Sequence, residues 1–308
     1  FRGVNLKGEP NALPGESLPT LEVGTQQNPI PAQHVARIRL HYIEGMDKED
    51  APALVCCSAR MELHGSPLKR PWAKLGATCH PGDLKIVVSE DVSDWRVGDE
   101  IIVTASKKVR TMSSDRDEDM GTEERIVKAI DGNSITLDKP LRLEHFGEED
   151  FRSEVANLSR NVIVESADPN GIRGHTMYHR YSKGGISYAR FAHLGKEGVL
   201  GRYAIHFHLV GATMRGSAVL GAAIVDSHNR WITIHGTQFL LVRDCVGYKS
   251  VGHGYFLENG TEVFNLLDRN LGVQAFKGRR LKGQDLPFDP NDGAAFWWAN
   301  GRNVFTRN

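Results

Sequence analysis

The sequence predicts an all-β protein whose second half forms a parallel β-helix. Short alternating or β-branched runs recur along the chain, each closed by Gly, Pro, Asn or Asp, with no helical segments between them. The second observation is a repeat: the stretch after His235-Gly236-Thr237 can be laid over the stretch after Asn259-Gly260-Thr261, a shift of 24 residues from 235 to 259. Such repeats are typical of solenoid coils, because each coil buries its inner face only by stacking on the next.

The strand pattern also predicts a division into two domains. Residues 1–32 are rich in Gly, Pro and Asn, which predicts loop with one short strand at most. The runs RIVKAI and SITL around Asp131-Gly132-Asn133 predict a hairpin. Because the spacing of the strands changes after about residue 155, we expect a β-rich domain over 1–150 and a β-helix over 151–308, interrupted by an inserted loop at roughly 277–293.

The charge balance excludes some classes of partner. The 308 residues contain 38 Lys and Arg and 38 Asp and Glu, so no overall basic field attracts nucleic acid or anionic lipid. No apolar stretch approaches the roughly 18 to 20 residues of a membrane span, and Phe1-Arg2-Gly3 does not begin a signal peptide. We therefore expect no nucleic acid partner and no membrane span, with any leader or anchor outside this sequence. The oligomeric state is left open.

Cysteine usage does not indicate a disulfide scaffold. The chain has four cysteines, and adjacent cysteines such as Cys56 and Cys57 rarely pair, because the geometry of such a bridge is strained. One bridge to Cys79 stays open from the sequence. The prediction is that these three residues and Cys245 are reduced.

The strand RYAIHFHLVG (202–211) carries the candidate site. His206 and His208 share one face of this strand, because alternate side chains of a strand point the same way. Coils of a β-helix lie about 4.8 Å apart, so side chains of the next coils can converge beside this pair. Imidazoles and a carboxylate so placed suit a divalent metal or general acid and base catalysis, although polar ladders and structural histidines are common on such folds. The predicted metal ligands are His206, His208 and His235, and the predicted catalytic residues are His206, His253, Glu258 and Arg230.

The inserted loop and the strand after it supply candidate contacts to an acidic sugar chain. The segment KGRRLKG places Lys277, Arg279 and Arg280 close together, and arginine suits bidentate binding of a carboxylate. A solvated loop is the alternative. Trp297 and Trp298 alternate faces, so one should belong to the core, while the other, taken as Trp298, stacks on a sugar ring or covers an apolar patch.

Long stretches of the chain resemble a known family. The run from GRYAIHFHLVG through WITIHGTQFLLVRDCVGYKSVGHGYFLENG to AAFWWANGRN resembles the β-helical part of the cell migration-inducing, hyaluronan-degrading proteins, which include the vertebrate cell-surface transmembrane hyaluronidase. Fibrocystin-like proteins share that architecture. Upstream, LEVGTQQNPIP and RMELHGSPLKRPWAKLGATCHPGDLKIVVSEDVSDWRVGDEIIVTAS resemble the eight-glycine domain of the same proteins. The resemblance, which covers nearly the whole chain from about residue 20, implies a right-handed parallel β-helix preceded by this smaller domain.

The resemblance also implies a function: an extracellular or cell-surface depolymerase of a hyaluronan-type glycosaminoglycan that depends on a divalent metal ion, calcium or a transition metal. Hydrolase and lyase chemistry stay open, and Arg230 is expected to steady a uronate carboxylate. A non-catalytic glycan-binding or adhesive scaffold is the alternative. Ala204 stands where relatives commonly have Pro, the link ATMRGSAVLGA is short, and the cysteine framework of vertebrate members is absent. Together these departures indicate a microbial relative and leave the polysaccharide open. The family pattern maps onto His206, His208, Arg230, His235, His253 and Glu258.

Overall fold

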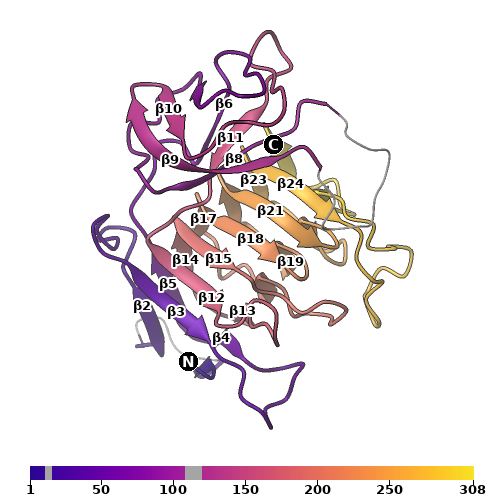
Figure 1. The fold of residues 1–308 in the computed structure, drawn as a ribbon. Coiled ribbons are helices and arrows are strands. Elements are labelled where there is room, and N and C mark those ends of the chain that lie inside the picture. The colour runs from indigo at the N-terminus through magenta and orange to yellow at the C-terminus, as the bar shows by residue number, and fades with distance from the viewer. Residues whose placement is uncertain (11–15, 108–119) are drawn as a thin grey trace. The chain divides into compact units, whose positions relative to one another are not determined.

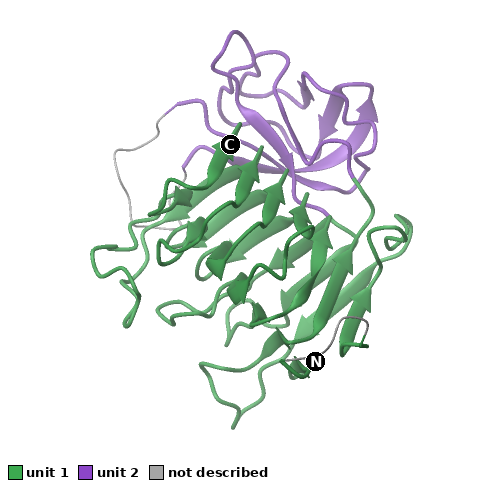
Figure 2. Ribbon diagram, turned by 180° about the vertical axis from the view of Figure 1, so that it is seen from behind, with its two compact units in different colours: residues 1–67, 160–308 green, residues 68–159 purple. Residues whose placement is uncertain are grey.

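The computed structural model describes residues 1–10, 16–107 and 120–308 and divides the chain into two compact units (Figures 1 and 2). One unit comprises residues 1–67 and 160–308, and the other comprises residues 68–159. The described residues form strands and no helix, which confirms the all-β prediction. Among them, accordingly, no helical segment is long and apolar enough to cross a membrane.

The larger unit is a parallel β-helix made of three sheets in which every strand pair is parallel. Each of the first six coils contributes one strand to each sheet and the seventh contributes to two of them, so each sheet runs along the stack of coils. Sheet A contains, in order, β1 (Val4–Lys7), β4 (Ala53–Cys57), β13 (His175–His179), β16 (Ile205–Gly211), β19 (Ile232–Thr237), β22 (Tyr255–Leu257) and β25 (Phe296–Trp297). Sheet B contains β2 (Thr20–Val23), β5 (Arg60–His64), β14 (Lys183–Ser187), β17 (Ala218–Leu220), β20 (Leu241–Arg243), β23 (Leu266–Asp268) and β26 (Val304–Thr306). Sheet C contains β3 (Ala36–Leu40), β12 (Val162–Ser166), β15 (Ala189–Ala192), β18 (Ala223–Ser227), β21 (Val246–Val251) and β24 (Leu271–Phe276).

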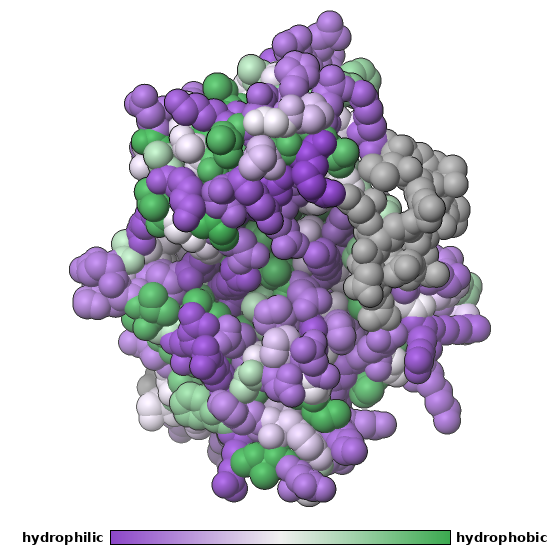
Figure 3. All heavy atoms as spheres, viewed as in Figure 1, coloured by the Kyte–Doolittle hydropathy of each residue, from purple (hydrophilic) through white to green (hydrophobic). Residues whose placement is uncertain are grey.

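The core of the β-helix follows from alternation along these strands. In sheet A, Phe207 pairs with Tyr178 of the preceding coil and with Ile234 of the following coil, and all three side chains are buried. The rings of Tyr178 and Phe207 stack with their centroids 4.9 Å apart. The intervening residues face outward, because alternate side chains of a strand lie on opposite faces of the sheet. The face viewed in Figure 3 is largely hydrophilic, with scattered apolar residues.

The register between coils refines the predicted repeat. Ile232 pairs with Tyr255, a step of 23 residues (255 − 232), whereas Leu241 pairs with Leu266, a step of 25 residues (266 − 241). The predicted shift of 24 residues lies between these values and matches neither sheet, because the turn from sheet A to sheet B is two residues longer in the later coil. The predicted inserted loop lies between β24 and β25.

The structure corrects the predicted domain boundary between residues 150 and 151. Residues 1–67 belong to the β-helix, since β1 pairs with β4, β2 with β5, and β3 with β12. Ala36 of β3 pairs with Val162 of β12, and residues 68–159 stand in the sequence between β5 and β12, which are successive strands of one coil. Residues 1–32, predicted to hold one short strand at most, contain β1 and β2. Their partners are too distant in sequence for a local pattern to show the pairing.

The smaller unit is an antiparallel sheet of six strands. The predicted hairpin is confirmed, because Asp131 and Ser134 pair on either side of a two-residue turn. All four cysteines of the chain are free. The strand order is β6 (Trp72–Lys74), β11 (Glu154–Asn157), β8 (Glu100–Val103), β9 (Glu123–Asp131), β10 (Ser134–Leu137) and β7 (Lys85–Val87).

Candidate metal centre and groove

A row of polar side chains crosses four successive coils on the outer face of sheet A. His208 of β16 is in register with His179 of β13 and with His235 of β19. Glu258 directly follows Leu257, the partner of Ile234, and so extends the row into the next coil. The rings of His179 and His208 stack at 5.1 Å. The register of a parallel sheet therefore brings residues 79 positions apart (258 − 179) into one line.

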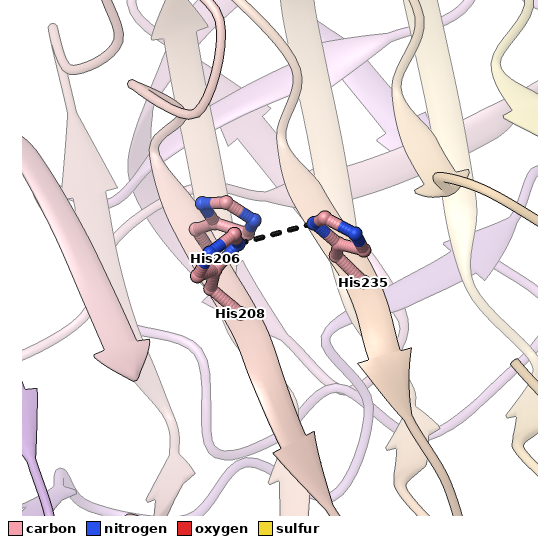
Figure 4. Close-up of side chains that lie close together, drawn as sticks. All are labelled: His206, His208 and His235. Carbon is pink, nitrogen blue, oxygen red and sulfur yellow. Dashed lines mark hydrogen bonds between the residues drawn. The ribbon is translucent and has the colours of Figure 1, made fainter. Parts of the chain in front are cut away.

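His206 lies beside this row and completes a cluster of three imidazoles (Figure 4). One nitrogen atom from each of His206, His208 and His235 lies within 4.8 Å of the other two. The Nδ1 atoms of His208 and His235 are 3.1 Å apart. The three predicted metal ligands are therefore close enough to share one ion.

Glu258 is buried beside the cluster, with 4% of its surface exposed. Its Oε1 accepts hydrogen bonds from the hydroxyl of Tyr203 at 2.6 Å and from Nη1 of Arg230 at 3.0 Å. Its Oε2 lies 3.2 Å from Nδ1 of His235 and 3.5 Å from Nε2 of His206. Burial alone raises the pKa of Glu258, but the two histidines and Arg230 outweigh burial and hold its pKa well below the usual value. The side chain is a fixed carboxylate anion.

The imidazoles differ in their affinity for protons. Burial lowers the pKa of His206, and burial with the neighbouring imidazoles lowers the pKa of His208 to about 3. At His235, burial lowers the pKa, but the charges of Glu258 and Asp285 outweigh it, and the net shift is upward. His206 and His208 are therefore neutral at pH 7, the form in which imidazole binds a metal ion.

The hydrogen bonds of His206 direct one nitrogen at the cluster. The carbonyl oxygen of Gly201 lies 3.0 Å from Nδ1 of His206. A carbonyl oxygen can only accept a hydrogen bond, so Nδ1 is the donor. In the neutral ring the lone pair is then on Nε2, which is buried and has no hydrogen-bond partner. Oε2 of Glu258 is likewise buried without one. Two orphaned acceptor atoms that face each other are the arrangement a cation would satisfy.

Two predicted catalytic residues are held beneath the surface. Arg230 is fully buried, its guanidinium lies 3.4 Å from the ring centre of Phe256, and Nη2 is 3.7 Å from Asp289. His253 is 2% exposed, accepts the backbone N–H of Ala294 at Nδ1, and donates from Nε2 to Asp289 at 2.8 Å. The expected contact of Arg230 with a uronate carboxylate therefore does not fit this structure, because the guanidinium is already enclosed. Both residues instead position the carboxylates around the cluster.

The inserted loop supplies two carboxylates that the sequence reasoning missed. Oδ2 of Asp285 lies 3.3 Å from Nε2 of His235, and Asp289 receives the hydrogen bond from His253. The side chain of Asp285 is half exposed. The only signal in the sequence is the cluster of aspartates in GQDLPFDPND, within the same loop as the basic segment that drew the prediction. Tyr203, which binds Glu258, was also missed, because a buried tyrosine has no distinctive sequence context.

A groove extends from the cluster across the earlier coils of sheet A. Its volume is about 750 Å³, and His206 and His208 lie at one end of its lining. His175 and His179 of β13 line it further along. Arg2 and Arg202 add two cationic side chains to the lining. This volume is in the range of pockets that hold ligands of several rings.

The predicted sugar contacts of the inserted loop do not line this groove. Lys277 pairs with Asp292 at 2.8 Å, and Arg279, whose side chain is 84% exposed, lies 3.9 Å from Glu197. Arg280 donates to the carbonyl of Pro287 within the loop. Trp298 stacks on Phe305 with centroids 4.2 Å apart and is 46% exposed. The alternatives, a solvated loop for the basic segment and an apolar cover for Trp298, describe these residues better than the predicted substrate contacts.

A β-bulge follows the histidine pair. The register between β16 and β19 shifts between His208 and Gly211, and Leu209 adopts φ of 53°. Left-handed backbone is uncommon for leucine, and bulges of this kind re-aim side chains beside functional sites. Gly236 on the next coil makes room, since a Cβ atom there would lie 2.7 Å from Cδ2 of Leu209.

Three of the separations between these donor atoms match those in a tetrahedral metal site. Ligand atoms bound to zinc at 2.0–2.1 Å in a tetrahedron lie about 3.3 Å from one another. The distances from His235 Nδ1 to His208 Nδ1 and to Glu258 Oε2 are 3.1 Å and 3.2 Å, and His206 Nε2 lies 3.5 Å from the same carboxylate oxygen. Three imidazoles and one carboxylate suit zinc or another transition metal, whereas calcium takes oxygen ligands.

Comparison with known proteins assigns the β-helix to a family. Residues 171–308 match the family model described as CEMIP beta-helix. Residues 171–308 therefore belong to the CEMIP β-helix family. This range contains all three clustered histidines, Glu258 and both aspartates of the inserted loop, whereas β1 to β5 and β12 precede it.

The curated relatives that this chain matches are much longer than the chain itself. Mouse fibrocystin-L is 30% identical over 94% of this chain, and a G8 domain-containing protein of Dictyostelium discoideum is 31% identical over 80% of it. The chain spans only 8% and 17% of these two relatives, respectively. Among solved structures, the tailspike gp49 of Pseudomonas phage LKA1 aligns with 79% of this chain and 45% of its own at 12% identity, with a TM-score of 0.26.

Proposed function

We propose that this chain binds a divalent transition metal ion at the histidine cluster and cleaves an acidic polysaccharide of hyaluronan type that lies in the adjoining groove. The observation that carries the proposal is the position of the cluster. Three imidazole nitrogens and a carboxylate oxygen converge on the outer face of sheet A, and two of these residues, His206 and His208, line one end of a 750 Å³ groove. Such polymers lie outside cells or on their surfaces, so we place the protein there.

The proposed ligands are Nε2 of His206, Nδ1 of His208, Nδ1 of His235 and Oε2 of Glu258. A bound divalent ion would supply a Lewis acid that neutralises negative charge on the substrate. The buried residues around the cluster fix the ligands: Tyr203 and Arg230 hold Glu258, and the Gly201 carbonyl fixes the tautomer of His206. Such outer contacts orient the ligands of a metal centre and tune their basicity.

The groove supports binding of a negatively charged chain. Arg2 and Arg202 line it and can contact uronate carboxylates, and Arg202 is held in place by its ion pair with Asp50. The pairs formed by arginine and carboxylate are strong and directional. These two residues take over the substrate role that the sequence assigned to Arg230 and to the inserted loop.

The titratable groups that reach the surface are the ones that can transfer protons to the substrate. Asp285 is half exposed beside His235, and His179 is partly exposed beside His208. Hydrolysis with a pair of carboxylates and β-elimination with a neutral imidazole as base both use groups of these kinds. An elimination leaves an unsaturated uronate that absorbs in the ultraviolet, and hydrolysis leaves none, so the product separates the two reactions.

The test combines metal analysis with a panel of polysaccharides. The purified chain is incubated with hyaluronan, chondroitin, alginate and a neutral glucan, and fragment size is followed by size-exclusion chromatography with light scattering. We expect fragments from at least one acidic polymer, none from the neutral glucan, about one transition metal ion per chain, and loss of both metal and activity in His235→Ala.

His34→Ala is the matched control, because His34 is an exposed histidine of the same unit that does not line the groove. This variant should keep the metal and the activity of the wild type. Binding of an acidic polymer without any fragments, with or without added metal, would show that the chain is a glycan-binding scaffold and would overturn the enzymatic proposal.

A further inference from the structure

A second pocket lies on the outer face of sheet B. Its volume is about 370 Å³, and its lining includes Glu62 and His64 of β5 and Ser187 of β14. The two strands are adjacent, with Ser187 in register with His64 and Gly185 in register with Glu62. Glu62 and His64 belong to ELHG, one of the phrases that carry the resemblance to the eight-glycine domain, and the function proposed above does not use them.

These three side chains form a continuous relay. The hydroxyl oxygen of Ser187 lies 2.6 Å from Nδ1 of His64, and Nε2 of His64 lies 2.7 Å from Oε2 of Glu62. Glu62 is fixed in turn, because Oε1 accepts from Arg60 at 2.9 Å and Oε2 accepts the backbone N–H of Gly185 at 2.9 Å. A nucleophile, a base and a group that orients the base, each within hydrogen-bond distance of the next, are the parts of a hydrolase triad.

The direction of each hydrogen bond follows from Glu62. Burial raises the pKa of Glu62, but the hydrogen bonds and charges of His64 and Arg60 outweigh burial and lower its pKa, so the carboxylate is ionised and can only accept. Nε2 of His64 must therefore be the donor, and in the neutral ring the lone pair lies on Nδ1. Ser187 then donates its proton to Nδ1. This is the arrangement in which the hydroxyl is ready for deprotonation by the imidazole.

The pocket leaves space in front of the relay. Gly185 forms part of the lining, and a Cβ atom there would lie 3.5 Å from Cε1 of His64 and 3.6 Å from Oε2 of Glu62. A longer side chain at this position would project over the relay, so glycine keeps the approach open. Gln26 and Gln27 also line the pocket, and a side-chain amide is a group that can donate to an oxyanion.

We propose that Ser187, His64 and Glu62 form a second, independent catalytic site that hydrolyses short acyl esters such as acetate esters. Oγ of Ser187 attacks the ester carbonyl carbon while His64 takes the hydroxyl proton. The bond to the alcohol oxygen breaks, and the alcohol leaves with that proton from His64. Water then attacks the acyl-serine, again giving its proton to His64, and the carboxylic acid leaves as the serine regains its proton. Glu62 acts as a positioning residue by holding the imidazole.

The size of the pocket selects a short acyl group. A volume of about 370 Å³ is at the lower end of the range for small-molecule sites, and the lining is rich in polar side chains and glycine. The pocket lacks the length and the apolar surface that a long fatty acyl chain needs. An acetyl group on a polar alcohol such as a sugar hydroxyl fits both the small volume and the polar lining.

The test uses the whole chain with p-nitrophenyl acetate, p-nitrophenyl octanoate and a fluorophosphonate probe. We expect hydrolysis of the acetate above the buffer rate, slower hydrolysis of the octanoate, and probe attached to Ser187 by peptide mass spectrometry. Ser187→Ala and His64→Ala should lower kcat/KM for the acetate by about 100-fold or more and abolish labelling. Glu62→Gln should lower kcat with little change in KM, and Glu62→Asp should restore part of it.

Ser166→Ala is the matched control, since Ser166 is also buried in the same unit and its hydroxyl oxygen accepts the backbone N–H of Gly174. It should retain labelling and hydrolysis. Wild-type protein that hydrolyses the acetate no faster than buffer, or as fast as folded Ser187→Ala, overturns the proposal. Circular dichroism of each variant establishes folding, so lost activity through unfolding is distinguished from lost chemistry. Removal of metal with a chelator should leave this activity unchanged.

Discussion

The Nδ1 atoms of His208 and His235 face each other at 3.1 Å across two neighbouring coils. The side chains are in register on adjacent strands of sheet A, so the distance is set by the spacing of the coils. The parallel scaffold thus holds two of the proposed ligand atoms at the separation that a tetrahedral metal ion requires. This relationship connects the fold directly to the proposed chemistry.

Removal of one ligand should therefore weaken metal binding strongly. His208→Ala leaves three of the four proposed donors, and we expect the affinity for zinc to fall at least 100-fold. Competition titration against a chromogenic chelator measures the affinity. His179→Ala is a close comparison, because His179 stacks on His208 and is not a proposed ligand. An equal loss in both variants would contradict the assignment of the ligands.

Arg230 should matter more for stability than for direct substrate contact. It is fully buried and pairs with Glu258, so Arg230→Met leaves a buried carboxylate without its partner. The expected loss is about 3–5 kcal/mol in the free energy of unfolding, measured by urea denaturation of the metal-free protein. Arg37→Ala, which removes an exposed ion pair with Glu165, should cost about 1 kcal/mol or less. Similar losses of unfolding free energy in the two variants would contradict the stabilising role of the buried pair of Arg230 and Glu258.

Arg202 should contribute to binding of the acidic polymer. Arg202→Ala removes a cation from the groove, and we expect KM for the polysaccharide to rise several-fold, with a weaker dependence on salt concentration than in the wild type. Arg279→Ala provides the contrast, because Arg279 does not line the groove and its side chain is 84% exposed. A larger rise in KM in Arg279→Ala than in Arg202→Ala would indicate that the inserted loop contacts the substrate.

Gly236→Ala tests the bulge beside the cluster. Gly236 has φ of 51°, and the added Cβ would come within 2.7 Å of Leu209. We expect the melting temperature to fall by several degrees, corresponding to about 1–3 kcal/mol, and metal affinity to fall with it, since His235 is the adjacent residue. Gly45→Ala, which also has positive φ but open space around the Cβ, separates backbone strain from the clash. Equal losses would show that the contact with Leu209 is unimportant.

Glu123 should make the smaller unit sensitive to acid. Burial raises its pKa, but hydrogen bonds from His145, from the backbone amides of Arg142 and Leu143, and from Arg125 outweigh burial and lower the pKa to about 2. A carboxyl whose pKa is lower in the folded state stabilises above its unfolded pKa, and this stability is lost as the pH falls toward 2. The contribution at pH 7 is about 3 kcal/mol.

Urea denaturation of the wild type and Glu123→Gln between pH 7 and pH 2 measures this contribution. The difference in unfolding free energy should be largest at pH 7 and should shrink as the pH falls from about 5 to 2. A difference that is constant over this range would mean that the ionisation of Glu123 is not coupled to folding.

Much of the β-helix could be read from local patterns. The alternation in RYAIHFHLVG places His206 and His208 on one face, and the structure brings His235 to the same spot. The shift of 24 residues was near the true steps of 23 and 25, but a one-residue error changes which residues meet in a strand pair. The roles of His253 and Arg230 could not be read in this way, because burial depends on packing from other coils and from the inserted loop.

The sequence by itself determined the strand content, the repeat and the shared face of the histidine pair, because these depend on periodicities of two residues and of one coil. Only the tertiary structure decided that residues 1–67 join the β-helix, that Asp285 reaches His235, and that Ser187 meets His64. The last two contacts join residues separated by 50 and 123 positions (285 − 235 and 187 − 64). Such pairs are chosen by the stacking of whole coils, and no local pattern encodes that stacking.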